Sequence, residues 1–336
     1  MAVASCGSYF VSVPISAGTG QGGYKVLIDS SVVYEGTVYN PAAAGSSVSI
    51  DVMPVVSCFT PADTGKLSNW GSSCSTASGT FYRNFQINNA SNNGYLGGGA
   101  LVYANTRDAS LGTNLDFLQL PVRRIYNGTY LALTAFGTGS LSYTTHWENG
   151  RAVANTAGYI SGSAGRIAGT LSFSDYNGFK PVSVDMGFNG RYTYDIEIVN
   201  CVPKNSFIVY FVNDFGGITP ILCDGANNVV VNTERSQMKK YTTISTPQAF
   251  GKFNYITSST RTWKLNTGLV IDDGCAKNME AFFRSPYVWV YSIDEGKVWS
   301  AILTESSYTV KNYNANKMFN YTLTLTDSIE LNARAI

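Results

Sequence analysis

The chain has 336 residues, a mass of 36.2 kDa and a net charge of +1 from 23 basic and 22 acidic residues. Apolar residues make up 44% of it, enough for a core, whereas charged residues make up 13%, about half of the ~25% in an average soluble domain. This composition argues against a nucleic-acid-binding protein, a disordered tail and a membrane protein, and it predicts a surface that neighbouring proteins cover.

The first 200 residues are predicted to form short β-strands. Runs of β-branched and aromatic residues alternate there with turn residues, including the Asn-Gly pairs typical of tight hairpins. Residues 60–80 and 88–116 are rich in Gly, Ser, Asn and Thr, and they are predicted to be long loops. The predicted strands are Tyr24–Asp29, Val32–Tyr39, Ser47–Val52, Thr80–Ile87, Ala100–Ala104, Val122–Ile125, Tyr130–Phe136, Leu141–His146, Gly169–Phe173, Val182–Met186 and Tyr192–Val199.

The composition changes near Cys201, where strongly apolar segments begin. Residues 233–262 interrupt them and are predicted to be a polar crossover with one strand, Gly251–Ile256. The other strands predicted in this part are Ser206–Asn213, Ile218–Cys223, Val229–Asn232, Tyr287–Ile293, Lys297–Leu303, Ser307–Asn312 and Met318–Thr326. We therefore expect a mainly β protein of antiparallel sandwich domains, with an N-terminal β region over 1–200 and a C-terminal sandwich over 201–336.

One helix is predicted, and it follows Asp272 and Asp273. These two acids stand at the N-cap and first-turn positions, and Pro286 is placed to stop the helix. Apolar residues recur between them at helical spacing, at Cys275, Ala276, Met279, Phe282 and Phe283.

The motifs that could carry chemistry have simpler structural explanations. Residues 18–23 match the dinucleotide pattern G-x-G-x-x-G, but a predicted strand follows them where that pattern needs a helix. Asp195 and Glu197 share one face of a predicted strand, which suits a solvated surface as well as glycoside hydrolysis. His146 is the sole histidine and stands beside a predicted turn. We predict no catalytic residue, no metal and no cofactor.

The six cysteines are spread thinly and form no C-x-x-C pair, which is neither a zinc pattern nor a small disulfide scaffold. We expect them to be mostly reduced and buried, as small apolar residues. They are Cys6, Cys58, Cys74, Cys201, Cys223 and Cys275. The N-terminus has neither the cationic nor the apolar region of a signal peptide.

The C-terminal segment, Thr262–Ile336, resembles the end of virion structural proteins from tailed phages of Bacteroidota, including crAss-like phages. The resemblance lies in five ordered motifs, and residues 23–52 resemble the hairpin that opens those proteins. The motifs are Leu265–Gly268, Asp272–Asp273, Ser285–Val290, Thr304–Lys311 and Lys317–Leu323. The resemblance implies a non-enzymatic subunit of a tail or head–tail connector ring.

Such a subunit would lie in the virion, after assembly in the host cytoplasm. It would contact copies of itself and neighbouring tail, portal or connector proteins, with DNA only as passing cargo and no membrane. Tyr, Trp and Arg are common interface anchors. The predicted contact residues are Arg123, Arg124, Trp147, Tyr210, Phe215, Trp263, Trp289, Trp299, Tyr308, Tyr313, Phe319 and Tyr321. A receptor- or glycan-binding tail adhesin is the alternative, and it would need exposed aromatic side chains along a groove.

Overall fold

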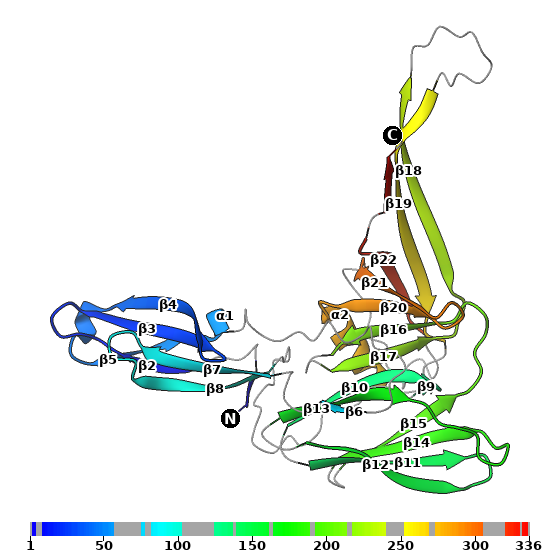
Figure 1. Ribbon diagram of the computed structural model, residues 1–336, viewed down its shortest axis with the longest axis horizontal. Helices are drawn as coiled ribbons and strands as arrows, with labels where there is room; N and C mark the ends of the chain where they lie inside the picture. Colours follow the sequence, from blue (N-terminus) through cyan, green and yellow to red (C-terminus); the bar gives the residue numbers. More distant parts are fainter. Residues whose placement is uncertain are drawn as a thin grey trace. The chain divides into compact units, whose positions relative to one another are not determined.

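The protein is mainly β, as predicted, and most of its strand pairs are antiparallel (Figure 1). The computed structural model describes residues 2–4, 9–56, 75–77, 82–102, 124–136, 139–160, 164–188, 192–213, 217–239, 252–268, 273–304, 320–329 and 331–334. In this part of the chain no helix has both the length and the apolar character needed to cross a membrane.

The chain divides into two compact units. Unit 1 comprises residues 1–200 and 212–219, and unit 2 comprises residues 201–211 and 220–336. The main division lies between Asn200 and Cys201, where the composition of the sequence changes.

The N-terminal part of unit 1 has a five-stranded sheet in the order β1-β8-β7-β3-β4 and a ribbon of β2 and β5. Valines and isoleucines at alternate positions of these strands, joined by Phe85 and Met53, form one buried cluster. The elements are β1 (Ala2–Ala4), β2 (Phe10–Pro14), β3 (Gln21–Ile28), β4 (Ser31–Tyr39), η1 (Pro41–Ala43), β5 (Ser47–Asp51), α1 (Met53–Val56), β7 (Tyr82–Asn89) and β8 (Tyr95–Val102).

The glycines of residues 18–23 make a turn and then enter β3. Gly20 has φ +65° and donates its N–H to the Ser16 carbonyl, while Ser16 donates to the Gln21 carbonyl. Since a strand follows the turn, no helix N-terminus is available there for a pyrophosphate, as the sequence predicted.

The rest of unit 1 has a second five-stranded sheet, β12-β11-β14-β15-β9, and the paired strands β10, β13 and β6. Its core contains Leu131 and Leu171 from β10 and β13, and Leu141, Val184 and Ile196 from the five-stranded sheet. The strands are β6 (Ser75–Ala77), β9 (Arg124–Tyr126), β10 (Thr129–Phe136), β11 (Gly139–Trp147), β12 (Ala152–Ile160), β13 (Ala164–Leu171), β14 (Pro181–Phe188) and β15 (Tyr192–Val199).

Unit 2 is built on strands in the order β18-β19-β22-β21-β20-β16-β17, and β23 also pairs with β19. Helix α2 contributes Met279 and Phe282 to the core of this sheet, and the Phe282 ring meets Phe211 edge-on with centroids 5.5 Å apart. The elements are β16 (Phe207–Val212), β17 (Ile218–Cys223), β18 (Asn228–Lys239), β19 (Lys252–Asn266), α2 (Asp273–Arg284), β20 (Val288–Ser292), β21 (Lys297–Leu303), β22 (Thr322–Asp327) and β23 (Leu331–Arg334).

Several predictions about individual elements were wrong. The predicted loops contain strand β6 and the first part of β8, of which the predicted strand Ala100–Ala104 covers only the end. Strands β1, β2, β12 and β23 were not predicted. Most of the polar crossover belongs to two long strands, β18 and β19. Residues 307–312, the segment 269–272 that includes Asp272, and four of the six cysteines or their side chains lie outside the described residues.

The two cysteines whose side chains are described are both free. Cys223 is fully buried, and this burial raises the pKa of its thiol. Cys201 is exposed, contrary to the expectation of buried cysteines.

Candidate assembly surface

Strands β18 and β19 form a long hairpin, here called the arm (residues 228–239 and 252–266). They pair from Asn228 with Lys264 to Lys239 with Lys252. On the other side of β19, β22 pairs only at Thr262–Asn266 and β23 only at Ile256–Ser259. The arm therefore extends well beyond β22, as Figure 1 shows. Within the described chain, no strand pairs with the outer edge of β18.

The base of the arm is fixed by the side chain of Asn227. Its Nδ2 donates to the carbonyls of Asn205 and Cys223, at 2.8 Å each, and its Oδ1 accepts from the N–H of Asn266 at 2.8 Å. One amide thus joins the end of β17, the start of β18 and the end of β19. This explains why the arm begins here in a defined position.

The outer strand of the arm exposes three consecutive valines. The exposed fractions are 41% for Val229, 37% for Val230 and 56% for Val231. Because successive side chains of a strand point to opposite faces, both faces of β18 are apolar at this edge. An unpaired strand edge with exposed β-branched residues is a template for another strand, and proteins that avoid such pairing place charges or proline there.

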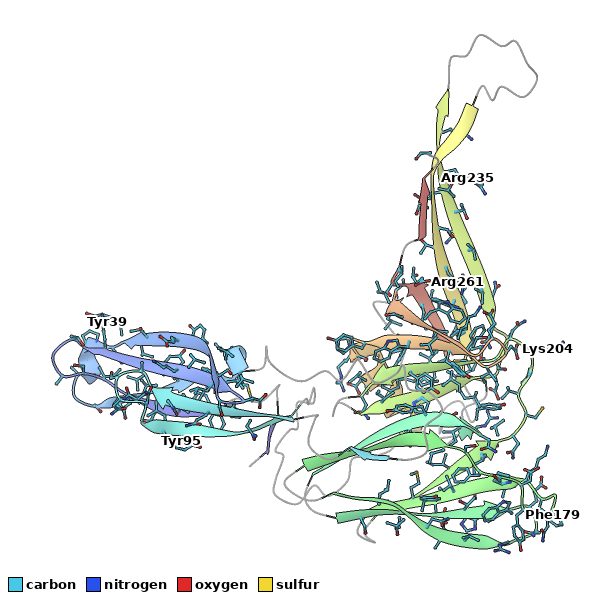
Figure 2. The ribbon with its side chains drawn as sticks, in the orientation of Figure 1. Tyr39, Tyr95, Phe179, Lys204, Arg235 and Arg261 are labelled. Carbon is cyan, nitrogen blue, oxygen red and sulfur yellow. The ribbon has the colours of Figure 1, made fainter. Side chains whose placement is uncertain are left out.

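Two charged residues follow the valines on β18. Glu234 and Arg235 are exposed and pair in the ladder with Ser258 and Thr257, which are neutral. Neither forms an ion pair with another described residue. Figure 2 shows Arg235 along the arm and Arg261 near its base.

A groove of about 270 Å³ lies at the base of the arm, here called the root groove. Its lining residues come from four adjacent strands and the turn after β22: Val231, Ser259, Arg261, Val298, Trp299, Ser300, Asp327 and Ile329. The Arg261 guanidinium lies 4.9 Å from the Trp299 ring centroid and 5.8 Å from that of Trp263. Such cation–π contacts hold the guanidinium over the rings.

The root groove continues the core face of the sheet beyond the buried cluster that α2 joins. Arg261 stands two residues from buried Trp263, and Asp327 stands two residues from buried Leu325, so each pair shares a face. The core face is thus closed at one end and open at the other, where Val231 and Ile329 are exposed.

Four predicted contact residues, Tyr210, Trp263, Trp289 and Tyr321, are instead buried side chains of unit 2. They fill the sheet's own core or its flanks, so they have little surface to offer a neighbouring subunit, and the prediction is wrong for them. Burial of apolar area is stabilising because the area leaves water. These rings are already buried within the chain, so a contact with a neighbour would remove little more of their area from water. Aromatic content by itself does not distinguish side chains that face inward from those that face outward.

The remaining predicted contact residues have different surroundings. Trp299 is half-buried and lines the root groove. Arg124 forms an ion pair with Glu197 of its own sheet, with Nε and Oε2 3.4 Å apart. The five that lie outside the described residues are Arg123, Phe215, Tyr308, Tyr313 and Phe319.

Trp147, also predicted as a contact, belongs to an aromatic cluster at the end of β11. Its Nε1 donates to the Ser174 carbonyl at 3.2 Å, and its ring centroid lies 6.2 Å from that of Tyr176. The Arg151 guanidinium lies 3.7 Å from the Tyr176 centroid, and Phe179 nearby is exposed (Figure 2). We call these four residues (Trp147, Arg151, Tyr176 and Phe179) the aromatic tip.

The residues that suggested acid–base chemistry lie on the outer face of the β11-β14-β15 sheet. His146 Nε2 and Asp185 Oδ2 are 2.9 Å apart. Ser183 lies directly across from His146 in the ladder, but no hydrogen bond joins their side chains. Asp195 and Glu197 share this face, as their spacing predicted, and both are exposed. A glycosidase needs one acid in a desolvated position, which neither carboxylate occupies.

Metal chemistry has no candidate site in the described residues, where no three His, Cys, Asp or Glu side chains are arranged to hold an ion. Sequence reasoning missed Val229–Val231, Arg261 and Ile329, the residues that define the arm edge and the root groove. The run of valines was a signal for a strand, but the polar sequence after it hid the strand's length.

No protein-family model matches the chain, and a comparison with curated proteins finds no significant match.

Proposed function

We propose that the protein is a non-enzymatic structural protein of a tailed-phage particle. It would be a subunit of a tail or head–tail connector ring that assembles with itself and with neighbouring tail proteins around the DNA channel. The observation that carries this proposal is the unpaired, valine-bearing edge of β18 on an arm that extends beyond its sheet. The sequence resemblance of residues 262–336 supports the same function.

The edge of β18 supports assembly because an isolated β-ribbon is only marginally stable in water. A strand added to this edge would satisfy the outward N–H and C=O groups and cover the valines. The low charge of the chain, 23 basic against 22 acidic residues, keeps repulsion between copies small. A near-neutral channel wall would also let DNA pass without binding phosphates strongly.

The proposal is tested on purified phage particles by mass spectrometry and electron microscopy. The expected result is many copies of this chain, arranged as a closed ring on the axis of the tail or connector. Absence of the chain from particles would contradict the proposal, and so would a strongly basic lumen in the ring.

A second candidate function is receptor or glycan binding, which the aromatic tip favours. Trp, Tyr and Arg dominate binding hot spots, and Phe179 of the tip is exposed. A glycan screen with wild type and a Trp147→Ala variant tests it. Binding that the variant loses, together with a location at fibre tips, would favour this function over the ring.

A further inference from the structure

We infer that the outer edge of β18 receives strand β4 of a second copy of this chain, whose side chains then flank the root groove. The inference rests on the proposed function only in taking the protein to assemble with itself. The two edges that meet lie on different parts of the chain and generate a closed ring.

The first step is the geometry of the β18 edge. A strand added there would lie about 4.8 Å from β18 and continue its ladder. Its side chains on one face would pack beside Val229 and Val231, next to the root groove, and those on the other face beside Val230. One added strand thus covers all three exposed valines and the β18 side of the root groove.

The second step is the choice of the strand that is added. β4 is the outer strand of its sheet and pairs only with β3 among the described strands. It exposes Val32, Tyr34 and Tyr39, side chains with high strand propensity. The other nine-residue edge strand, β12, has no large exposed apolar side chain among its described residues. β4 and β18 are therefore the two long apolar edges that the described chain offers.

The charges on the two edges are compatible with their pairing. Residues 228–233 of β18 carry no charge, and Glu35 of β4 already pairs with Lys25 of β3 at 3.3 Å. Joining the two edges over residues 228–233 therefore leaves no new uncompensated charge beside the valines, and Glu234 and Arg235 lie beyond this stretch. This avoids the desolvation cost that would oppose burial of an unpaired charge.

The pairing of β4 with β18 determines the symmetry of the assembly. β4 belongs to unit 1 and the arm belongs to unit 2, so the two copies would use different surfaces. Such a heterologous contact leaves a free β4 at one end and a free β18 at the other, and it closes when a ring is complete. Pairing of β18 with β18 of a second copy would be isologous and would stop at a dimer.

The inference is tested first by the concentration dependence of assembly of the full chain, measured by sedimentation velocity. The variants Val230→Lys and Val231→Lys place a lysine on the β18 edge, and Val32→Lys places one on the β4 edge. The matched control is Val182→Lys, because Val182 is 38% exposed, like Val230 at 37%, but lies on β14 between two paired strands. We expect each edge variant to weaken association by about tenfold or more, since edge lysines block strand addition, and the control to match wild type.

The second measurement identifies the partner strand. A photo-crosslinking amino acid at position 231 is placed in an isotope-labelled copy, which is mixed with unlabelled chain. We expect adducts between the labelled β18 and unlabelled peptides that contain residues 31–39. The inference is overturned if adducts join β18 only to β18, form only within one copy, or are absent from the assembled fraction.

The two proposals fail separately. If particles contain the chain as a ring but the three edge variants assemble like Val182→Lys, the inference is wrong and the proposed function stands. If the edge variants dissociate as expected but particles lack the chain, the proposed function is wrong and the pairing stands. A wild-type chain that stays monomeric at all concentrations also overturns the inference.

Discussion

The ring of Tyr24 fills the space beside Gly36, its ladder partner across β3 and β4, where a β-carbon of residue 36 would lie. A β-carbon added to Gly36 would stand 2.5 Å from Cζ of Tyr24, closer than any real contact. The absence of a side chain at Gly36 therefore allows the ring to approach closely. The ring covers the backbone of edge strand β4 at the position where glycine has no side chain of its own.

A Gly36→Ala substitution is expected to force the Tyr24 ring aside and lower the free energy of unfolding by about 1 kcal/mol, the low end of overpacking costs, because the atoms displaced are the far end of a partly exposed side chain. Chemical denaturation followed by tyrosine fluorescence measures the loss. Gly18→Ala is the control, because a β-carbon at Gly18 meets nothing within 4 Å. Equal effects of the two substitutions would show that the ring contact does not matter.

The titration of Tyr24 provides a prediction about pH. Burial, followed by the charge of and a hydrogen bond with Tyr34, raises the pKa of the Tyr24 hydroxyl above its ordinary value. Folding therefore favours the neutral phenol. Its contribution to stability is complete below the pKa of an unfolded tyrosine, about 10, and is lost as the pH rises through the higher folded value.

The measurement is NMR of isotope-labelled tyrosine rings, with Tyr24 assigned through Tyr24→Phe. A Tyr34→Phe variant is expected to lower the pKa of Tyr24 towards its ordinary value, because it removes the Tyr34 charge. A Tyr24 that titrates like the exposed tyrosines would contradict the prediction.

The helix of unit 2 offers a matched pair of core substitutions. Phe282 is fully buried and Phe283 only partly, although they are adjacent on α2. Phe282→Ala is expected to cost about 3–5 kcal/mol of unfolding free energy, the usual range for a buried Phe, and Phe283→Ala clearly less. Thermal unfolding of both variants measures the difference, and a loss below ~1 kcal/mol for Phe282→Ala would mean that α2 does not close this core.

Asn127 joins distant segments of unit 1 through its side chain. Its Oδ1 accepts from Phe173 N–H and its Nδ2 donates to the Phe173 carbonyl, both at 2.9 Å, while Nδ2 also donates to Asn200 Oδ1 at 3.0 Å. Asn127→Asp replaces the Nδ2 donor by a carboxylate oxygen. That oxygen would face two acceptors, the Phe173 carbonyl and Asn200 Oδ1. We expect a loss of about 1–3 kcal/mol, the cost of unsatisfied polar groups in a partly buried site.

The control for Asn127 is Asn149→Asp, measured by the same denaturation. Among the described residues, Asn149 bonds through its Oδ1, which accepts from the N–H of Arg151 at 3.0 Å, and an aspartate keeps that acceptor. The control is expected to retain wild-type stability at neutral pH. A loss as large as that of Asn127→Asp would assign the effect to added charge.

The sequence predicted the strands whose apolar residues either alternate or form a continuous run. β3, β5, β16 and β20 are of this kind, and so is α2, where helical spacing and the following proline agreed. In each of these elements the local sequence preference for a strand or a helix agrees with the burial of the same residues in the fold. Such elements can therefore be predicted from sequence.

The segments that escaped prediction, including the part of β8 before Ala100, are held by contacts that the local sequence preference does not contain. β8 carries three consecutive glycines, which weaken a strand in isolation. In the fold they allow close packing, since a β-carbon on Gly98 would stand 2.5 Å from the Phe85 carbonyl oxygen. Tyr9 OH also exchanges hydrogen bonds with the Gly98 N–H and carbonyl, at 2.9 and 3.2 Å.

The candidate assembly surface was harder to predict than the fold for the same reason. Aromatic content alone selected Trp263 and Tyr210, but the pairing partners of β16 and β19 place these rings inside. Which strand lies at a sheet edge depends on the order of all strands. That order is a property of the whole chain, and no window of sequence contains it.

The open end of the core face in unit 2 has a thermodynamic consequence. A partner strand beside the root groove would extend the hydrophobic interior of one subunit into the next, so that folding and association share one equilibrium. By mass action, the temperature at which unit 2 melts would then rise with protein concentration. Edge lysines on β18 would remove that dependence without changing the melting temperature of the dilute monomer.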